Sequence, residues 1–319
     1  MNISIVIPNY NGEHLLRKNL GKVIDASMRY IKQKGDRVDV IIVDDGSRDE
    51  SKKFIKYQIS NLKESDKLSI VLFENKKNKG FSSTVNKGVR NAKGDIVVLL
   101  NTDVEPEKDF LMPLVEHFKN EKVFAVGCLD KSIEKTGVVL RGRGIGKWQR
   151  GFLVHSKGEI DKSDTLWVSG GSGAFKRSIW DKLGGFDQLY NPFYWEDIDL
   201  SYRALKSGYQ IIFEPKSIVV HQHEQGSIKR KHSPFQIKII AYRNQFIFVW
   251  KNATDLSLQF SYVAWLPYRF AKAFISKDWA FFIGFFLALM ILPKVIKSKF
   301  EVRKDFIKTD GQVMEMFKE

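Results

Sequence analysis

Apolar residues recur along the first hundred positions in short runs, and the stretches between them have the spacing of amphipathic helices. Each run is β-branched or apolar enough to form a strand that is buried on both faces. The runs cover residues 3–7, 40–43, 68–73 and 96–100. Between the first two runs, the residues on one helical face are Leu15, Leu16, Leu20, Val23 and Ile24. Strands that alternate with helices in this way predict an α/β fold with a mostly parallel sheet flanked by helices.

Two further patterns lie in the connecting segments. Ser47 and Glu50 have the spacing of a capping box, which predicts that a helix begins there. Residues 131–164 are rich in Gly, Lys and Arg and have weak periodicity, so RGRGIGKWQRG is expected to be a mobile loop. Its glycines do not stand between a first strand and a helix, as a dinucleotide-binding fingerprint requires. A nicotinamide-linked oxidoreductase is therefore disfavoured.

The composition changes near residue 233, where Phe, Trp, Tyr and Ile become mixed with Lys and Arg. The aromatic segments after this point have the pattern of core or of a membrane-interface belt. They contain Phe246, Phe248, Val249, Trp250, Phe260, Tyr262 and Trp265. We expect a catalytic domain over residues 1–232; the family resemblance described below implies that it has a nucleotide-binding half at about 1–105 and an acceptor half at about 106–232. Residues 233–319 form a basic, aromatic-rich helical extension in this interpretation.

The net charge of +15 is concentrated in that extension. Residues 229–319 hold 16 Lys or Arg against 7 Asp or Glu, whereas the preceding residues hold 36 against 30. Basic residues follow an apolar run, WAFFIGFFLALMILP at 279–293, and this pattern suits a membrane surface better than nucleic acid. As a helix the run reaches about 22 Å, short of the roughly 30 Å hydrocarbon core. We expect a monotopic or re-entrant anchor; the alternative is a helix packed inside the protein or in a dimer.

The location of the protein is suggested by its cysteine content and its first residues. The single cysteine, Cys128, excludes an intramolecular disulfide framework and favours a reducing compartment; its apolar surroundings suit a small buried side chain. MNISIVIPNY reads as a first strand and not as a signal peptide. We therefore expect a cytoplasmic protein that is peripheral on the inner face of the cell membrane.

Carboxylates stand at three places where chemistry is expected. Asp44 and Asp45 follow the second apolar run, and Asp103 follows the fourth, so they should lie at the carboxyl edge of the sheet, where ligands bind. Glu196 and Asp197 open a helical pattern in FYWEDIDLSYR. Such acids can hold a divalent metal, orient a nucleotide and take a proton from a hydroxyl.

Seven motifs in unbroken order resemble glycosyltransferase family 2, whose members are inverting and have the GT-A fold, a Rossmann-like α/β fold. The motifs are SIVIPNYNG, VDDGS, NKGFSSTVNKG, LLNTDVEP, SGGSGAFKRSIW, GGFDQLYNPFYWEDIDLSYR and VVHQH, and they cover roughly residues 3–225. The chain is most similar to rhamnosyltransferase-like and galactofuranosyltransferase-like members. The resemblance implies a non-processive transfer of a sugar from a UDP- or dTDP-sugar, dTDP-rhamnose among them, to a bacterial polysaccharide or lipid-linked glycan.

For the nucleotide, the resemblance implies that Asp44 accepts a hydrogen bond from the imide of uracil or thymine. Pro8, Asn9 and Tyr10 would border the base, with Tyr10 available to stack. The alternative for the two acids is turn chemistry, which applies more to Asp45 than to Asp44. Gly80 precedes a predicted helix start, whose free N–H groups favour an anion, although a plain capped helix explains it equally well. Asn86 would lie near the donor.

For the metal, the resemblance places Asn101, Thr102 and Asp103 at the family's D-x-D. A diphosphate leaving group needs a cation, and the site suits Mn²⁺ or Mg²⁺. Asn101 departs from the pattern, so Asp103 is expected to bind metal directly while Asn101 contacts ribose or a metal-bound water. His221 stands 24 positions after Asp197 and resembles the metal-binding His of galactofuranosyltransferase-like members.

Two other residues, His223 and Glu224, are second choices for the metal. On the acceptor side, Asp197 is expected to be the general base beside Glu196. Acids at a helix N-terminus are also explained by the helix dipole. Gly170 and Gly171 would let the backbone approach a sugar. Tyr194 and Trp195 would stack on one, or belong to the core.

Two other classes of function remain open at this point. A sugar-phosphate nucleotidyltransferase shares a similar core and metal, but its Gly-rich basic loop after the first strand is missing. An inactive membrane-associated scaffold of the same fold is the third class. The Q-x-x-R-W motif of processive synthases does not occur. No nucleic-acid partner is expected, and a homo-oligomer is left open.

Overall fold

The four expected strands form one half of a nine-stranded sheet in the computed structural model, which describes residues 1–61, 66–134, 137–221 and 231–317. These strands run parallel in the order β3-β2-β1-β4. Their bounds are β1 Ile3–Asn9, β2 Val38–Asp44, β3 Leu68–Glu74 and β4 Ile96–Leu100. The prediction that each is buried on both faces is wrong for β3. As the edge strand, β3 has one face only partly covered, and Val71 is exposed there.

The second half of the sheet is mixed. β10 (Ser172–Lys176) runs antiparallel between β4 and β6 (Val123–Glu134). β11 (Gln210–His221) is parallel to β6, and the short β5 (Val104–Pro106) pairs antiparallel with β11. The pairing of β11 with β6 is interrupted by a bulge between Glu214 and Ile218, which face the consecutive residues Cys128 and Leu129. The long strand β11 therefore ends between β6 and β5.

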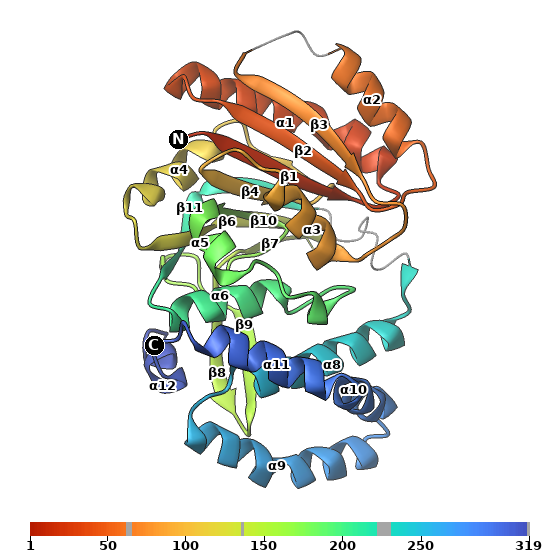
Figure 1. Cartoon of the computed structure of the whole chain (residues 1–319), viewed down its shortest axis with the longest axis vertical. Helices are drawn as coiled ribbons and strands as arrows, with labels where there is room; N and C mark the ends of the chain where they lie inside the picture. The colour runs from red at the N-terminus through yellow and green to blue at the C-terminus, as the bar shows by residue number, and fades with distance from the viewer. Residues whose placement is uncertain (62–65, 135–136, 222–230, 318–319) are drawn as a thin grey trace.

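Helices cover both faces of the sheet, and two apolar cores result (Figure 1). The predicted apolar face of α1 (Glu13–Lys34) is confirmed, with Leu15, Leu16, Leu20 and Val23 buried and Ile24 half-buried. The other elements of this part are α2 Ser51–Asn61, α3 Phe81–Arg90, α4 Leu111–Glu116, η1 His117–Lys119, α5 Arg177–Leu183, η2 Gln188–Tyr190 and α6 Glu196–Lys206.

The predicted capping box at Ser47 and Glu50 is wrong. The Ser47 hydroxyl accepts hydrogen bonds from the Asn11 N–H (2.8 Å) and from Asn9 Nδ2 (3.2 Å), so it belongs to the turn after β1. The helix begins later, at Ser51, whose N–H donates to the Asp49 carboxylate (3.2 Å). Spacing alone did not reveal that a distant turn uses the serine.

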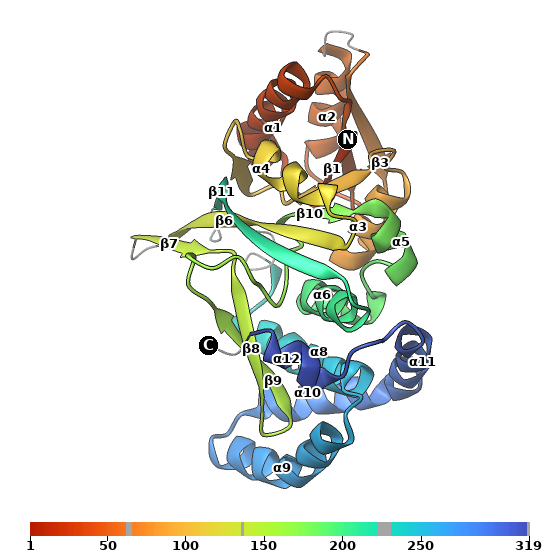
Figure 2. The ribbon, with the colours of Figure 1, turned by 90° about the vertical axis from the view of Figure 1, so that its left-hand side faces the viewer.

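The mobile loop expected at RGRGIGKWQRG is also wrong, because this segment belongs to a β-hairpin of β8 (Gly144–Gln149) and β9 (Phe152–Lys157). A second hairpin joins β6 to β7 (Gly137–Arg141). A Cβ on Gly144 would collide with the Trp167 ring. The glycines therefore mark close packing and not mobility. Figure 2 shows the β8–β9 hairpin reaching from the sheet toward α9.

The described part of the extension, residues 233–317, forms five helices that pack onto the sheet domain. They are α8 Pro234–Asn252, α9 Leu256–Ile275, α10 Trp279–Met290, α11 Leu292–Arg303 and α12 Asp310–Glu315. α8 begins with a capping box of Ser233 and Gln236, close to the predicted boundary, and it contacts α6, β9, η2 and α10. The division into domains stays a prediction. Within the described ranges no single helix is long and apolar enough to cross a membrane, although α10 and α11 pass that test together with a 67° bend between them.

Buried ion pairs join α6 to the extension. Lys251 of α8 is fully buried, and its Nζ lies 2.7 Å from Asp187 Oδ2 and 2.9 Å from Asp199 Oδ2. Burial raises the pKa of the Asp199 carboxyl, but Lys251 and Arg203 outweigh it and hold the pKa below its ordinary value. Lys206 of α6 is also fully buried, and its Nζ lies 2.8 Å from Asp310 Oδ1 of α12. Buried charges persist only when they are paired in this way.

Replacing Lys251 by Met removes the cation that Asp187 and Asp199 share. Because breaking a buried ion pair from one side costs about 3–5 kcal/mol, we expect Lys251→Met to lower the free energy of unfolding by that amount in urea denaturation. Lys297→Met is the matched control, since its side chain is 80% exposed and its loss should change stability by less than about 0.5 kcal/mol. Equal stability of the two variants would contradict a structural role for the pair.

Candidate active site

A cavity of about 340 Å³ opens at the carboxyl ends of β1, β2 and β4. Most of the residues singled out in the sequence line it. They are Pro8, Asn9, Tyr10, Asp45, Gly80, Asn101, Thr102, Asp103, Gly170, Gly171, Tyr194, Glu196, Asp197 and His221. Three others, Asp44, Asn86 and Trp195, do not line it. The fold therefore brings carboxylates that are far apart in sequence into one place.

The two neighbouring acids after β2 have different surroundings. Asp44 is fully buried, with one carboxylate oxygen accepting from Asn9 Nδ2 (2.9 Å) and the other from the Ser47 N–H (3.0 Å). Asp45 lines the cavity and accepts from the N–H groups of Lys79 and Gly80. The turn chemistry expected more of Asp45 is thus seen at Asp44 as well. Contact of Asp44 with a base stays a prediction, and its enclosure speaks against it.

Gly80 and Asn86 shape the cavity in different ways. Gly80 has φ +87°, and a Cβ there would lie 2.7 Å from Asn191 Oδ1, so only glycine fits before α3. Asn86 was expected near the donor. Instead its Nδ2 donates to the Phe186 carbonyl (2.7 Å), and its Oδ1 accepts from the Phe186 N–H (3.0 Å). Because both ends of this buried amide are used, Asn86 holds the loop that follows α5.

Asn101 packs against the backbone of Gly171, where the absence of a side chain leaves room for it. Its N–H donates to the Gly171 carbonyl (2.9 Å), and a Cβ on Gly171 would lie 2.7 Å from Asn101 Nδ2. The N–H of Gly171 in turn donates to the Ser169 hydroxyl (3.1 Å). The lack of a side chain at Gly171 therefore lets Asn101, at the D-x-D position, pack against the acceptor-side loop on one wall of the cavity.

Strand pairing brings His221 and Asp103 together. His221, the last residue of β11, pairs with Val104 of β5, which directly follows Asp103. His221 Nε2 lies 3.3 Å from Asp103 Oδ1, and Nδ1 lies 2.9 Å from Asp130 Oδ2. Burial lowers the pKa of His221, but hydrogen bonds and charge from the two carboxylates outweigh it and raise the pKa to about 9.

This arrangement fits a metal ligand whose orientation is fixed by a second residue. A metal-binding His commonly donates its other ring nitrogen to a carboxylate, and Asp130 stands in that place. Asp130 was not singled out from the sequence, although it ends the apolar run VFAVGCLD just as Asp44 ends its own. Within the described ranges no group of three or more Asp, Glu, His or Cys residues is arranged to hold a metal. His223 and Glu224 lie outside the described residues.

Glu196 and Asp197 begin α6 after two residues in the left-handed region, Tyr194 (φ 71°) and Trp195 (φ 76°). Asp197 accepts hydrogen bonds from the N–H groups of Gly170 (3.3 Å) and Ile198 (2.8 Å). Burial raises the pKa of the Asp197 carboxyl. Burial first, and the charge of Asp197 second, hold the pKa of Glu196 well above its ordinary value. Glu196 Oε2 is buried and has no hydrogen-bond partner among the residues that the structure describes.

The two aromatic residues before α6 differ. Tyr194 lines the cavity and is exposed, as the acceptor-stacking prediction requires. Trp195 is buried, and its ring packs against His155 at 5.1 Å and Phe248 at 5.1 Å between centroids. The prediction that Trp195 stacks on a sugar is wrong, because its left-handed backbone turns the indole into the core.

Residues that sequence reasoning missed close the cavity from the side of the extension. Lys231 and His232 both line it, and Lys231 Nζ lies 4.7 Å from the centre of the Tyr10 ring. The signal was the basic run before Ser233, which was counted only toward the charge of residues 229–319. A cation above an aromatic face at this distance is a favourable contact.

α8 also holds the segment 189–194 that borders the cavity. Asn244 is fully buried, and its Nδ2 lies within 3.0 Å of the carbonyl oxygens of Tyr190, Phe193 and Tyr194. The neighbouring Arg243 donates to the carbonyls of Leu189 and Asn191. These contacts were invisible in the sequence, because nothing in the helical pattern marks a polar residue that faces a distant loop.

Comparison with known proteins agrees with this geometry. Residues 4–184 match the model of Glycosyl transferase family 2, which is more than half of the chain. The chain belongs to this family. The predicted family and the predicted class of enzyme are confirmed.

Two curated relatives of this family 2 glycosyltransferase are bacterial. Probable glycosyltransferase YdaM of Bacillus subtilis (strain 168) is 30% identical over 225 residues, which are 70% of this chain and 51% of that protein. O-antigen chain rhamnosyltransferase RfbN of Salmonella typhimurium is 26% identical over 231 residues, 70% of this chain and 67% of that protein. The chain thus spans only about half the length of the first relative.

Among solved structures, GalNAc-T7 with UDP, GalNAc and Mn²⁺ matches with a TM-score of 0.60 at 19% identity. The match covers 79% of this chain and 48% of that one. At this identity the likeness shows the fold alone, and the predicted GT-A fold is confirmed.

The side-chain amide of Asn244 is a hydrogen-bond donor shared by the carbonyls of Tyr190, Phe193 and Tyr194, and its removal leaves them without it. We expect Asn244→Ala to lower kcat at least about tenfold by loosening the segment before Asp197, while calorimetric nucleotide affinity changes less than about threefold. Asn61→Ala, at the exposed end of α2, is the matched control. A fall in nucleotide affinity as large as the fall in kcat would contradict a role confined to the catalytic segment.

Proposed function

We propose that this glycosyltransferase is inverting and non-processive, and that it moves a sugar from a nucleoside-diphosphate donor to a glycan hydroxyl. The observation that carries the proposal is the meeting of two pairs of residues in one cavity: Asp103 with His221, and Glu196 with Asp197. The first pair suits the diphosphate and the second suits the acceptor. The cavity volume lies in the range of small-molecule sites.

The nucleotide occupies the end of the cavity near β1 and β2. Tyr10 offers a ring to the base, and Pro8 and Asn9 border it. Asp45 lies on the same wall, and Lys231 above Tyr10 adds a positive charge that suits a diphosphate. UDP and dTDP are the expected nucleotides. The relation to RfbN, which is named a rhamnosyltransferase of an O-antigen chain, supports dTDP-rhamnose and a bacterial polysaccharide or lipid-linked glycan as acceptor.

Asp103 and His221 are the residues that would hold Mn²⁺ or Mg²⁺, with Asp130 fixing the orientation of the imidazole. A divalent cation there offsets the charge that develops on the departing diphosphate. Two protein donors leave room for water and for diphosphate oxygens, as is usual where a metal is bound together with a phosphate substrate. GalNAc-T7, which shares the fold, was solved with UDP and Mn²⁺, and this supports the assignment.

On the acceptor side, Asp197 removes the proton from the attacking hydroxyl. The hydroxyl oxygen bonds to the anomeric carbon while the bond from that carbon to the diphosphate oxygen breaks, so a single displacement inverts the configuration. The hydrogen bonds from Gly170 and Ile198 fix the Asp197 carboxylate, and burial raises its pKa and hence its basicity. Glu196 offers to a sugar hydroxyl an oxygen that has no hydrogen-bond partner among the described residues.

The role of Asp197 is tested by Asp197→Asn, which keeps the shape and removes the base. We expect nucleoside diphosphate release from a panel of UDP-, dTDP- and GDP-sugars to fall about a thousandfold, while calorimetric binding of the free nucleotide is retained. Because the base must be deprotonated and burial raises its pKa, the acid limb of the wild-type pH profile should lie above that of an ordinary aspartate.

Asp181→Asn, at a half-exposed acid on α5, is the matched control and should keep full activity. Retained turnover in Asp197→Asn would exclude it as the base. Release of pyrophosphate in place of nucleoside diphosphate would identify a nucleotidyltransferase. A protein that binds nucleotide but acts on no donor, with any acceptor, would be the inactive scaffold.

The metal assignment is tested by His221→Ala and Asp103→Ala. We expect each to weaken Mn²⁺-dependent nucleotide binding by about 10- to 100-fold in calorimetry, because each removes one donor from the site. His117→Ala is the matched control, since His117 is paired with Glu214 away from the cavity. Metal titrations that coincide with those of the wild type would reject the site.

A further inference from the structure

The outer side of α9 is apolar and open to solvent. Leu256, Phe260, Val263 and Phe274 fall on one face of this helix, and they are 65–74% exposed. Other residues of α9 pack inward: the Tyr262 ring contacts Phe152, and the Phe270 ring contacts Phe281 and Phe285 of α10. Large apolar side chains exposed together in a row are unusual on a soluble surface and mark a contact site.

α10 continues this surface. The sequence suggested either a membrane anchor or a helix packed inside the protein, and each of these describes only one side of α10. Its inner side is buried against α8, where Gly284 admits the backbone of Ile239 and the Cβ of Tyr242. Its outer side carries Trp279, Ile283, Phe286 and Met290, all exposed. The helix is therefore neither wholly internal nor free to insert along its whole circumference.

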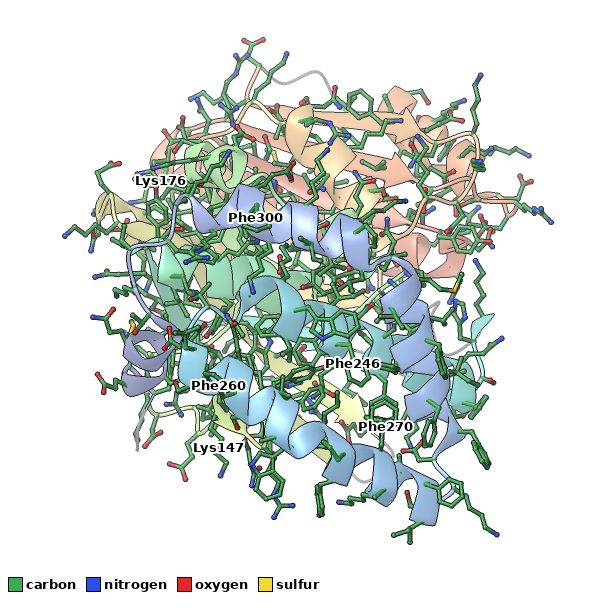
Figure 3. All side chains as sticks on the ribbon, turned by 60° about the horizontal axis from the view of Figure 1, so that its bottom comes forward. Lys147, Lys176, Phe246, Phe260, Phe270 and Phe300 are labelled. Atoms are coloured by element: carbon green, nitrogen blue, oxygen red, sulfur yellow. The ribbon has the colours of Figure 1, made fainter. Side chains whose placement is uncertain are left out.

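The two rows meet where α9 ends. The rings of Phe274 and Trp279 lie 6.4 Å apart between centroids, so the exposed sides of α9 and α10 form one continuous surface. We call it the α9–α10 face, made of Leu256, Phe260, Val263, Phe274, Trp279, Ile283, Phe286 and Met290. Figure 3 looks toward this end of the molecule, with α9 across the front and Phe260 labelled on it.

Basic residues surround the α9–α10 face. Lys272 and Lys277 stand two positions before and three positions after Phe274 in the chain, and both are exposed. Arg150, at the tip of the β8–β9 hairpin, lies 5.0 Å from the rings of Trp265 and Tyr268. From residue 256 to residue 304 the chain holds eight Lys or Arg against two acids. Trp and Tyr at the edge of an apolar surface, with cations beyond them, are typical of side chains at the boundary of a bilayer.

We propose that the α9–α10 face binds the surface of an anionic lipid bilayer, with its apolar row among the acyl chains and its lysines at the headgroups. A second copy of the chain is a poorer occupant, because the like charges of the two rims would oppose each other. The location that this implies is the inner face of the cell membrane. The inference concerns a surface outside the cavity and stands independently of the donor and acceptor.

α8 connects this surface to the cavity. Tyr242 and Ile239 receive α10, whereas Arg243 and Asn244 hold the segment 189–194. A molecule bound to a bilayer through α9 and α10 thus keeps its catalytic segment in a fixed orientation to the lipid surface, as a lipid-linked acceptor requires.

The test uses flotation of the full chain with vesicles of phosphatidylcholine alone or mixed with phosphatidylglycerol. The double variant Phe260→Asp/Phe274→Asp places charges in the apolar row and should lower the partition coefficient on anionic vesicles at least about tenfold. Tyr57→Asp is the matched control. Tyr57 is 63% exposed on α2, at the opposite end of the molecule (Figure 1), and its replacement should leave binding unchanged.

A second variant, Lys272→Gln/Lys277→Gln, addresses the charge. It should weaken binding to anionic vesicles roughly 30-fold at low salt and hardly affect the weak binding to neutral vesicles, since each lysine near an anionic surface contributes about fivefold. Both variants alter exposed residues, so their melting curves and donor turnover without vesicles should match the wild type.

Recovery of wild type and both variants in equal amounts with anionic vesicles would overturn the proposal. So would a concentration-dependent dimer in light scattering that is lost in Phe260→Asp/Phe274→Asp while wild type does not bind vesicles, which would assign the face to a second copy. Donor turnover is measured separately, so loss of membrane binding and failure of the proposed transfer are distinguishable.

Discussion

The structure depends on charge pairs that are shut away from water between the catalytic helix and the extension. Lys206 and Lys251 carry no exposed surface, and each is held by carboxylates on the other side of the junction. Removing either side leaves an ion in the interior without compensation, which is far costlier than the loss of a surface pair. The helix that begins with Glu196 and Asp197 is thereby fixed to α8 and α12. The extension is therefore joined to α6 by buried charges as well as by apolar packing.

Two carboxylates on α6, those of Asp197 and Asp199, have opposite surroundings. Asp199 is paired with cations, so its carboxyl is held below its ordinary pKa despite complete burial. Two positions earlier, Asp197 accepts hydrogen bonds from the backbone N–H groups of Gly170 and Ile198, and burial raises its pKa. Neighbouring acids on one helix thus differ: Asp199 is part of a buried ion-pair network, whereas Asp197 has the surroundings that suit the proton transfer proposed for it. Spacing in the sequence puts Arg203 four residues after Asp199, and the structure confirms this pair. The spacing does not reveal Lys251, which is 52 positions away and supplies the other cation.

The features that could be predicted from the sequence are those that depend on residues close together in the chain. Apolar runs and helical spacing predicted the first four strands and α1, because these reflect which face of an element is buried. The acids at strand ends followed from the same logic, and most of them meet in the cavity. Asn86, Trp195 and Asn244 could not be placed, since the loops they contact are distant in the chain. The β8–β9 hairpin was missed because its glycines admit neighbouring side chains and reduce the alternation of apolar residues.

The bulge in β11 has a consequence for how this fold can change. Between Glu214 and Ile218 the strand takes up three residues that have no counterpart on β6, and only beyond them does His221 arrive beside Asp103 and Asp130. Alternate residues of a strand face opposite sides of the sheet. Gaining or losing one residue beyond the bulge would turn the imidazole to the other side. Insertions in surface turns would therefore leave this site in place, whereas an insertion or deletion between Ile218 and His221 would not.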